Sequence, residues 1–374
     1  MIVMKFGGTS VGSAERIKEV FDLVNKRRQM KPVVVVSAVG GVTDMLINAS
    51  NKALNREGVP ADLMTAIIDK HKTILNNLGL NAKMLDELLM ELTEIIQGIY
   101  LIREISPKTL DLISSFGEQM SSRIVAAYFE KAGLPAKAYM GWDAGIVTDS
   151  VFNSAEVLPE TYTKIPAIIK ENLGHVPVVT GFIAKNSEGQ ITTLGRGGSD
   201  YTAGIIGSAI NAKEIQIWTD VNGILTTDPR IVKDAKCIDK ISFSEASELA
   251  YFGAKVLHPK TIHPAVKKNI PVVVLNTYNP DHPGTVILPE CPTDKIFTAL
   301  TFKKKVTTVR ICSTRMFLAY GFMAKVFDVF KRHKISVDMI ATSEVSVSVT
   351  LNNAENIEEA MSELKEFGTP LVLG

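Results

Sequence analysis

The chain has few cysteines, and none stands in a pattern typical of a metal site. Its 374 residues include three, Cys237, Cys291 and Cys312, which lie far apart in the sequence. An odd number of widely spaced cysteines argues against both a disulfide framework and a zinc site. A reducing compartment is the default for such a sequence, so we expect a cytoplasmic protein.

Long apolar runs and blocks of a single charge are missing as well. No stretch reaches the roughly 18 apolar residues of a membrane-spanning helix, and the first residues lack the basic and apolar segments of a signal peptide. Basic residues number 41 and acidic residues 40, which gives a formal net charge of +1. This balance argues against nucleic acid or a membrane surface as a partner.

The length suits two or three domains, and up to residue 300 strand-like runs alternate with helical stretches. The run PVVVVSA, residues 32–38, is apolar without alternation, which is typical of a parallel strand covered on both faces. Further strands are expected at 2–6, 136–139, 175–180, 215–219 and 271–276. Helices are expected at 14–28, over most of 44–131 and at 199–212. The alternation predicts a three-layer αβα domain with a mainly parallel sheet.

After residue 300 the pattern changes. Strands are expected at 306–312, 336–341 and 344–351, and helices at 321–332 and 357–367. This β-α-β-β-α order is that of a ferredoxin-like unit, with 369–373 as a candidate for one more strand.

Two adjacent glycines follow the first expected strand, in KFGGTS (5–10). A glycine-rich turn from a strand into a helix exposes backbone N–H groups and the positive helix end, which suit a phosphate. Lys5 adds a full positive charge. The segment is not a Walker A loop, because Ser13-Ala14 stand where Lys-Ser or Lys-Thr is required. Taken alone, it fits an ordinary strand-to-helix turn equally well.

A second glycine-rich segment, TTLGRGGSDYTA (192–203), surrounds Arg196 with three glycines. The planar fork of arginine can bind a carboxylate or a phosphate with two hydrogen bonds. An arginine held among glycines is harder to explain as a solvated surface charge, so we favour a functional role. Ser199 and Asp200, which follow, could equally be helix N-caps.

Three further segments contain candidate polar groups. In WTDVNGILTTDPRIV (218–232), Asp220 and Arg230 could contact a nucleotide at the carboxyl edge of the sheet, or they lie in two surface turns. Glu118 in SFGEQMS is either functional or an exposed helix carboxylate. Lys255 lies in an apolar stretch, where a lysine needs a partner. His258 and His263 are five residues apart, which is not the spacing of a helical zinc pair, so we expect no metal site.

Taken together, KFGGTSVG, SAVGGVTDML, SFGEQMS, TTLGRGGSDYTA, TDVNGILTTDPR and FGAKVLHPKTI resemble the aspartate kinases of the amino-acid kinase superfamily. The resemblance covers nearly the whole chain. It implies phosphorylation of the β-carboxylate of L-aspartate by ATP with Mg²⁺, giving 4-phospho-L-aspartate, the entry to lysine, threonine and methionine biosynthesis. A carboxylate is already an anionic nucleophile at neutral pH, so this reaction needs positive charge and positioning rather than a general base.

The resemblance also implies residue roles and domain limits. Catalytic residues would be Lys5, Arg196, Asp200 and Lys255, and aspartate would be bound by Ser37, Thr43, Glu118, Arg196 and Ser199. ATP would be bound by Lys5, Gly7, Gly8, Ser10, Thr219, Asp220, Asp228, Arg230 and Lys255. Glu118 would receive the substrate ammonium, and Arg196 would clamp its α-carboxylate. The catalytic domain would span 1–297, with an aspartate lobe to about 190 and a nucleotide lobe after it. One departure is Leu225, which stands where many relatives have tyrosine.

The tail, 298–374, resembles the first ACT domain of these enzymes. ACT domains bind amino-acid effectors and pair between chains, which implies a homodimer or higher oligomer. An effector, lysine or threonine, would be held by Met316, Phe322, Ser336, Val337, Asp338 and Glu344, although these could equally belong to a plain domain core with surface acids. Family members normally continue into a second ACT domain, so we expect the regulatory region to be partial.

Two alternatives stay open. One is another superfamily kinase, acting on glutamate, N-acetylglutamate, carbamate or UMP, against which the ACT-like tail and GRGGSDYTA argue. The other is a non-catalytic, effector-binding relative. The presence of Lys5, Arg196 and Asp200 argues against that second alternative.

Overall fold

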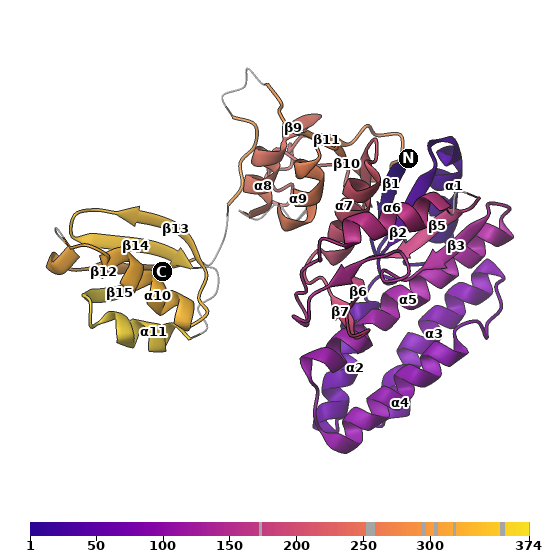
Figure 1. The fold of residues 1–374 in the computed structure, drawn as a ribbon, viewed down its shortest axis with the longest axis horizontal. Coiled ribbons are helices and arrows are strands. Elements are labelled where there is room, and N and C mark those ends of the chain that lie inside the picture. Colours follow the sequence, from indigo (N-terminus) through magenta and orange to yellow (C-terminus); the bar gives the residue numbers. More distant parts are fainter. Residues whose placement is uncertain are drawn as a thin grey trace. The chain divides into compact units, whose positions relative to one another are not determined.

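A computed structural model describes residues 1–171, 174–251, 259–292, 297–302, 306–316, 319–351 and 356–373 (Figure 1). The chain divides into two compact units, Met1–Thr301 and Phe302–Gly374. Among the helices described, none has both the length and the apolar character needed to cross a membrane.

The first unit is built on an eight-stranded sheet of order β3-β5-β2-β1-β8-β10-β11-β9. Every neighbouring pair is parallel except β10 and β11, so the expected mainly parallel sheet is confirmed. The strands are β1 (Ile2–Phe6), β2 (Pro32–Val36), β3 (Ala136–Tyr139), β5 (Val176–Thr180), β8 (Ile215–Thr219), β9 (Lys240–Ser242), β10 (Val272–Asn276) and β11 (Thr285–Leu288). All five residues of β1, β2, β5 and β10 are buried, as strands covered on both faces require.

Helices cover both faces of this sheet, and the alternation of side chains along β1 shows how the faces are divided. Ile2, Met4 and Phe6 pack in one apolar core with helices α1 to α5, whereas Val3 packs in a second core with α6 to α9. The helices are α1 (Ala14–Lys26), α2 (Val42–Asn55), α3 (Pro60–Leu78), α4 (Asp86–Ile102), α5 (Pro107–Lys131), α6 (Thr161–Glu171), α7 (Gly198–Ile210), α8 (Phe243–Tyr251) and α9 (Pro259–Lys267), with a 3₁₀ turn, η1, at Arg28–Met30. The three-layer arrangement is therefore confirmed.

A small second sheet in this unit was not expected from the sequence. It joins β4 (Val147–Thr148), β6 (Ile183–Asn186) and β7 (Ile191–Thr193) in the order β4-β6-β7. Strand β7 ends at Thr193, three residues before Arg196, so it leads directly into the glycines around that arginine.

The second unit is a four-stranded antiparallel sheet of order β13-β14-β12-β15 with two helices. Its elements are β12 (Thr307–Cys312), η2 (Thr314–Met316), α10 (Phe322–Arg332), β13 (Val337–Thr342), β14 (Ser346–Leu351), α11 (Ile357–Leu364) and β15 (Thr369–Leu373). The candidate strand at 369–373 is present and pairs with β12, which completes a βαββαβ fold. Val326, Val329, Phe330 and Leu364 form its core with residues of β12 and β14.

Candidate functional site

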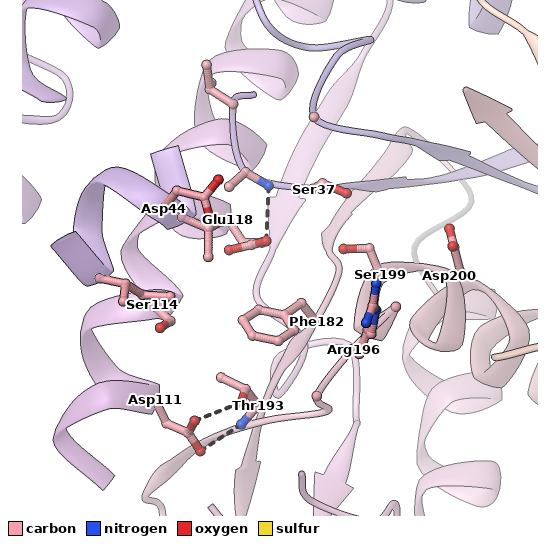
Figure 2. Close-up of a pocket in the computed structure, with 18 of the residues that line it drawn as sticks. Ser37, Asp44, Asp111, Ser114, Glu118, Phe182, Thr193, Arg196, Ser199 and Asp200 are labelled. Atoms are coloured by element: carbon pink, nitrogen blue, oxygen red, sulfur yellow. Dashed lines mark hydrogen bonds between the residues drawn. The ribbon is translucent and has the colours of Figure 1, made fainter. Parts of the chain in front are cut away.

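A cavity of about 550 Å³ lies in the first unit, where the carboxyl end of β1 meets the segments that lead into α2 and α7. Helix α5 forms part of its wall. Figure 2 shows the polar side chains that surround it. Eight of the residues singled out in the sequence line this cavity: Lys5, Gly8, Ser37, Thr43, Glu118, Arg196, Ser199 and Asp200.

Two helices begin at this cavity without a side-chain cap among the described residues. The N-cap of α2 is Gly41 (φ 80°) and that of α7 is Gly197 (φ 71°), and both residues line the cavity. The first N–H groups of a helix have no partner within the helix, and its dipole makes this end positive. Two such ends at one cavity favour an anionic ligand.

The glycines of the first two loops are needed for close packing. The amide of Gly40 donates to the carbonyl oxygen of Gly8 at 2.9 Å, so the loops after β1 and β2 are joined backbone to backbone. A Cβ on Gly8 would lie 2.9 Å from the carbonyl oxygen of Ala38. Any larger residue at position 8 would therefore push the two loops apart.

Lys5 and Asp200 form an ion pair at this cavity. Nζ of Lys5, on β1, lies 2.6 Å from Oδ1 of Asp200, in the first turn of α7, and both side chains are largely buried. The pair holds the ammonium group beside the first loop, since an added Cβ on Gly7 would lie 3.6 Å from Nζ.

Arg196 extends from the loop between β7 and α7. Its neighbours Gly195 and Gly197 both have left-handed φ angles, 73° and 71°, which glycine adopts without strain. The side chain is exposed, and among the described residues no carboxylate lies within 4.0 Å of it. The guanidinium group is thus available to a carboxylate or phosphate that enters the cavity.

Glu118 lies on α5. This helix begins at Pro107 because Ser106 is its N-cap and proline is favoured at the first helical position. The Glu118 side chain is 3% exposed, and Oε1 accepts a hydrogen bond from the amide of Ala38 at 3.0 Å. Oε2 is buried with no hydrogen-bond partner among the described residues. Burial raises the pKa of Glu118 to about 8, against the smaller opposite effect of the Ala38 amide. Such a carboxyl group needs a nearby cation in order to ionise at neutral pH, and the ammonium group of a ligand would supply one.

Sequence reasoning missed Asp111, a buried acid seven residues before Glu118 that also lines the cavity. Its carboxylate accepts hydrogen bonds from the amide and hydroxyl of Thr193 (3.0 and 2.7 Å) and from the amide of Asn153 (2.9 Å). Burial raises the pKa of Asp111, and these hydrogen bonds oppose the rise. A spacing of two helical turns from Glu118 is the one signal that could have indicated it.

Phe182 was missed too, and nothing in its sequence context indicates a role. It has a left-handed φ of 66°, which is rare for a bulky residue and is associated with functional sites. Its amide donates to the hydroxyl of Thr202 at 3.0 Å. In the view of Figure 2 its ring lies between Glu118 and Arg196, where it gives the cavity an apolar surface.

The residues expected to bind ATP do not all line this cavity. Gly7 lies beside β8, since its amide donates to the Trp218 carbonyl at 3.3 Å. Ser10 is fully buried, and its hydroxyl lies 2.7 Å from that of Thr277. Thr219 is the last residue of β8, so these groups gather at the carboxyl ends of β1, β8 and β10, where ligands bind open α/β sheets.

The other nucleotide residues occupy the loops after β8. Asp220 follows β8 directly, and its Oδ1 accepts from the hydroxyl of Thr219 at 3.2 Å. Arg230 forms an ion pair with Asp228 (Nη2 to Oδ2, 2.6 Å), and the Arg230 side chain is 73% exposed. Lys255 and His258 lie outside the described residues. Among the residues described, no cluster of three His, Cys, Asp or Glu side chains could hold a metal ion.

The six expected effector residues divide into two groups in the second unit. Phe322 is buried in its apolar core, and Met316 and Val337 pack against that core. Ser336 and Glu344 are exposed, and Asp338 is half-buried on β13. A cavity of about 590 Å³ in this unit is lined by none of the six.

Comparison with known proteins places each of the two units in a family. The sequence profile of the amino acid kinase family matches residues 1–276, and that of the ACT domain matches residues 309–366. The chain is 43% identical to aspartokinase 1, chloroplastic, of Arabidopsis thaliana over 94% of this chain and 63% of that protein. It is 37% identical to the lysine-sensitive aspartokinase 3 of Escherichia coli over 94% of this chain and 78% of that protein.

A solved structure is similar over the whole chain. Aspartokinase III of Escherichia coli, in its R-state complex with aspartate and ADP, superposes with a TM-score of 0.85 at 34% identity, covering 100% of this chain and 85% of that one. The chain spans just under two thirds of the length of the Arabidopsis relatives it matches. The profile match over most of the chain and the Escherichia coli relative together show that the chain belongs to the amino acid kinase family, among the aspartokinases, and that it contains an ACT domain.

Proposed function

We propose that the protein is an aspartate kinase, which transfers the γ-phosphoryl group of ATP to the β-carboxylate of L-aspartate. The observation that carries this proposal is that Glu118 and Arg196 line the same cavity. Among the described residues, Glu118 is a buried carboxylate with an unsatisfied oxygen and Arg196 is a guanidinium group without an ionic partner, and these match the ammonium and α-carboxylate of an amino acid. The Escherichia coli relative solved with aspartate and ADP supports the same assignment.

The remaining residues of the cavity suit the chemistry. The β-carboxylate oxygen attacks the γ-phosphorus, the bond from phosphorus to the bridging oxygen breaks, and ADP leaves with the electron pair. Two anions must approach each other, so positive charge has to offset their repulsion. Lys5 and the uncapped ends of α2 and α7 supply that charge, and Asp200 orients Lys5. Ser37, Thr43 and Ser199 supply hydroxyls to the same cavity.

Nucleotide binding is assigned to the neighbouring carboxyl edge of the sheet. Gly7, Gly8 and Ser10 belong to the first loop, and Thr219, Asp220, Asp228 and Arg230 lie on or after β8. Lys255 is kept in this role on the family resemblance alone. Mg²⁺ enters as part of the substrate MgATP, because magnesium is commonly held by phosphates with one or two carboxylates rather than by a cage of protein ligands.

Regulation and assembly are inferred from the second unit. We infer an amino-acid effector, lysine or threonine, at Met316, Phe322, Ser336, Val337, Asp338 and Glu344, and pairing of ACT domains between chains. Escherichia coli aspartokinase III has also been solved with lysine and aspartate in a T-state, which supports lysine. The unpaired cysteines fit a reducing compartment, and we keep the cytoplasm as the prediction, although the Arabidopsis relatives are named chloroplastic.

The test is ATP-dependent formation of an acyl phosphate, trapped as the hydroxamate, with aspartate compared against glutamate, each with and without lysine or threonine. We expect hydroxamate with aspartate and little with glutamate. Inhibition by lysine or threonine would support the effector. No product from either acid, in a folded protein that binds ATP, would overturn the proposal and favour a non-catalytic regulatory relative.

A further inference from the structure

A lysine on α3, outside the glycine-rich segments that form the cavity, contacts the cavity wall. Lys70 lies on α3, and its Nζ donates a hydrogen bond to the carbonyl oxygen of Gly40 at 2.7 Å. Gly40 lines the cavity, and its own amide joins the second loop to Gly8. Helix α3 thus reaches the point where the two loops meet.

The carbonyl that Lys70 holds belongs to the peptide between two glycines, Gly40 and Gly41. Glycine passes readily between regions of φ and ψ that other residues avoid, so this peptide can flip at little cost. A hydrogen bond from a charged donor is stronger than one from a neutral donor. Lys70 therefore selects one orientation of a peptide that is otherwise free to take two.

The selected orientation determines where the next amide points. None of the peptide bonds in the described part of the chain is cis, and in a planar trans peptide the C=O and the following N–H point in opposite directions. The Gly40 carbonyl points to α3, so the N–H of Gly41 points away from α3. Gly41 is exposed, lines the cavity and is the N-cap of α2. A Cβ at Gly41 would meet no atom of the described residues within 4 Å, so this side of the loop is open.

The charge of Lys70 is also uncompensated locally. Within the described parts of the chain, no carboxylate lies within 4.0 Å of its Nζ. An unpaired ammonium behind the loop favours an anion in front of it.

We propose that Lys70 is a positioning residue, which holds the Gly40–Gly41 peptide so that the N–H of Gly41 donates to an anionic oxygen of the bound substrate. This inference rests on the proposed function only for the identity of that substrate. The ligand group is a carboxylate or a phosphoryl oxygen, and the KM values of aspartate and ATP distinguish the two.

The test compares Lys70→Met with Lys70→Arg and with Lys72→Met. Lys72 lies on the same helix, is exposed, and serves as the matched control. We expect Lys70→Met to lower kcat/KM about tenfold, the effect of one oriented hydrogen bond, with Lys70→Arg retaining most of the activity and Lys72→Met near wild type. A rise in the KM of aspartate would assign the Gly41 amide to the carboxylate, and a rise in the KM of ATP would assign it to a phosphate.

A second measurement does not depend on catalysis. Amide hydrogen exchange over residues 38–45, with MgATP as the probe ligand, should be about tenfold faster in Lys70→Met than in Lys72→Met, again the scale of one hydrogen bond. If Lys70→Met does not fold, the measurement uses Lys70→Gln instead, which keeps a neutral hydrogen-bond donor. Unchanged exchange together with unchanged kinetics overturns the proposal. A wild-type protein that makes no acyl phosphate contradicts the kinase assignment, whereas the exchange comparison still decides the role of Lys70.

Discussion

The ammonium of Lys5 and the carboxylate of Asp200 lie 2.6 Å apart, although 195 positions separate them in the sequence (200 − 5). The first is on the central strand β1, and the second is in the first turn of α7. The ion pair fixes a cation at the cavity where α2 and α7 begin, both of them without a side-chain cap from the described residues. Asp200 therefore pairs the charge of a lysine that is largely buried, which a buried ionic group requires.

Loss of the Lys5 cation should slow the chemical step. Lys5→Met is expected to lower kcat about 10²- to 10³-fold, the usual effect of removing one group that stabilises a transferring oxyanion. The KM of aspartate should change little, because we propose that Arg196 and Glu118, and not Lys5, hold that substrate. Steady-state kinetics check this, and a variant with wild-type kcat would remove Lys5 from the mechanism.

The Arg196 guanidinium should matter for its shape as well as its charge. Arg196→Lys keeps the charge but loses the planar fork, so we expect the KM of aspartate to rise about 10- to 100-fold. The side chain is exposed and has no ionic partner among the described residues, so the melting temperature should not change. An unchanged KM would show that the α-carboxylate binds elsewhere.

Glu118 should make the free protein less stable as the pH rises. Its pKa is about 8 in the folded chain against an ordinary 4.5, so between these values the folded state keeps a proton that the unfolded state has lost. Stability from this group is therefore complete below about pH 4.5 and falls by at most about 1.4 kcal/mol per pH unit up to about pH 8. Glu118→Gln removes the titration. In urea unfolding, the free energy of unfolding of Glu118→Gln should increase relative to that of the wild type from pH 5 to pH 8. A difference between the two that stays constant with pH would contradict the assigned burial of Glu118.

The same group should release a proton when aspartate binds. At pH 7 a carboxyl group with a pKa of about 8 is mostly protonated, and an ammonium beside Oε2 would favour the ionised form. Calorimetric titration at pH 7 in buffers of different ionisation enthalpy should show close to one proton released, and none with Glu118→Gln. A binding enthalpy that does not depend on the buffer would remove Glu118 from the ammonium site.

Asp111 should stabilise the fold and also position the cavity wall. Asp111→Ala leaves the amides of Thr193 and Asn153 without their acceptor, so we expect a loss of about 2 to 4 kcal/mol in unfolding free energy. The KM of aspartate should also rise, because Thr193 leads into the Arg196 loop. Asp69→Ala, at an exposed position of α3, is the control and should stay within about 0.5 kcal/mol. Equal stability of the two variants would contradict this account.

Sequence reasoning was most successful where the pattern depends on burial. The run Pro32–Val36 is apolar throughout because β2 is covered on both faces, and the parallel sheet followed from it. The small sheet was missed because its strands have only two to four residues, too few to show a period. Helix α6 contains Pro166, which obscured the helical pattern.

The site was predicted unevenly for a similar reason. Lys5, Glu118 and Arg196 lie in segments that resemble a family. The residues alone favoured a functional role for Arg196, but they fitted an ordinary turn at Lys5 equally well and made an exposed carboxylate the commoner interpretation of Glu118. Asp111 and Phe182 depend on contacts with Thr193 and Thr202, far along the chain, which no local pattern reveals. The backbone strain at Phe182 is likewise visible only in three dimensions.

The most direct measurement is phosphorus NMR of the 374-residue chain incubated with MgATP and L-aspartate. The account predicts ADP and an acyl phosphate in equal amounts, formed with aspartate, not formed with glutamate, and lost in Lys5→Met. ADP that accumulates without an acyl phosphate, or product that forms equally well from glutamate, would contradict it.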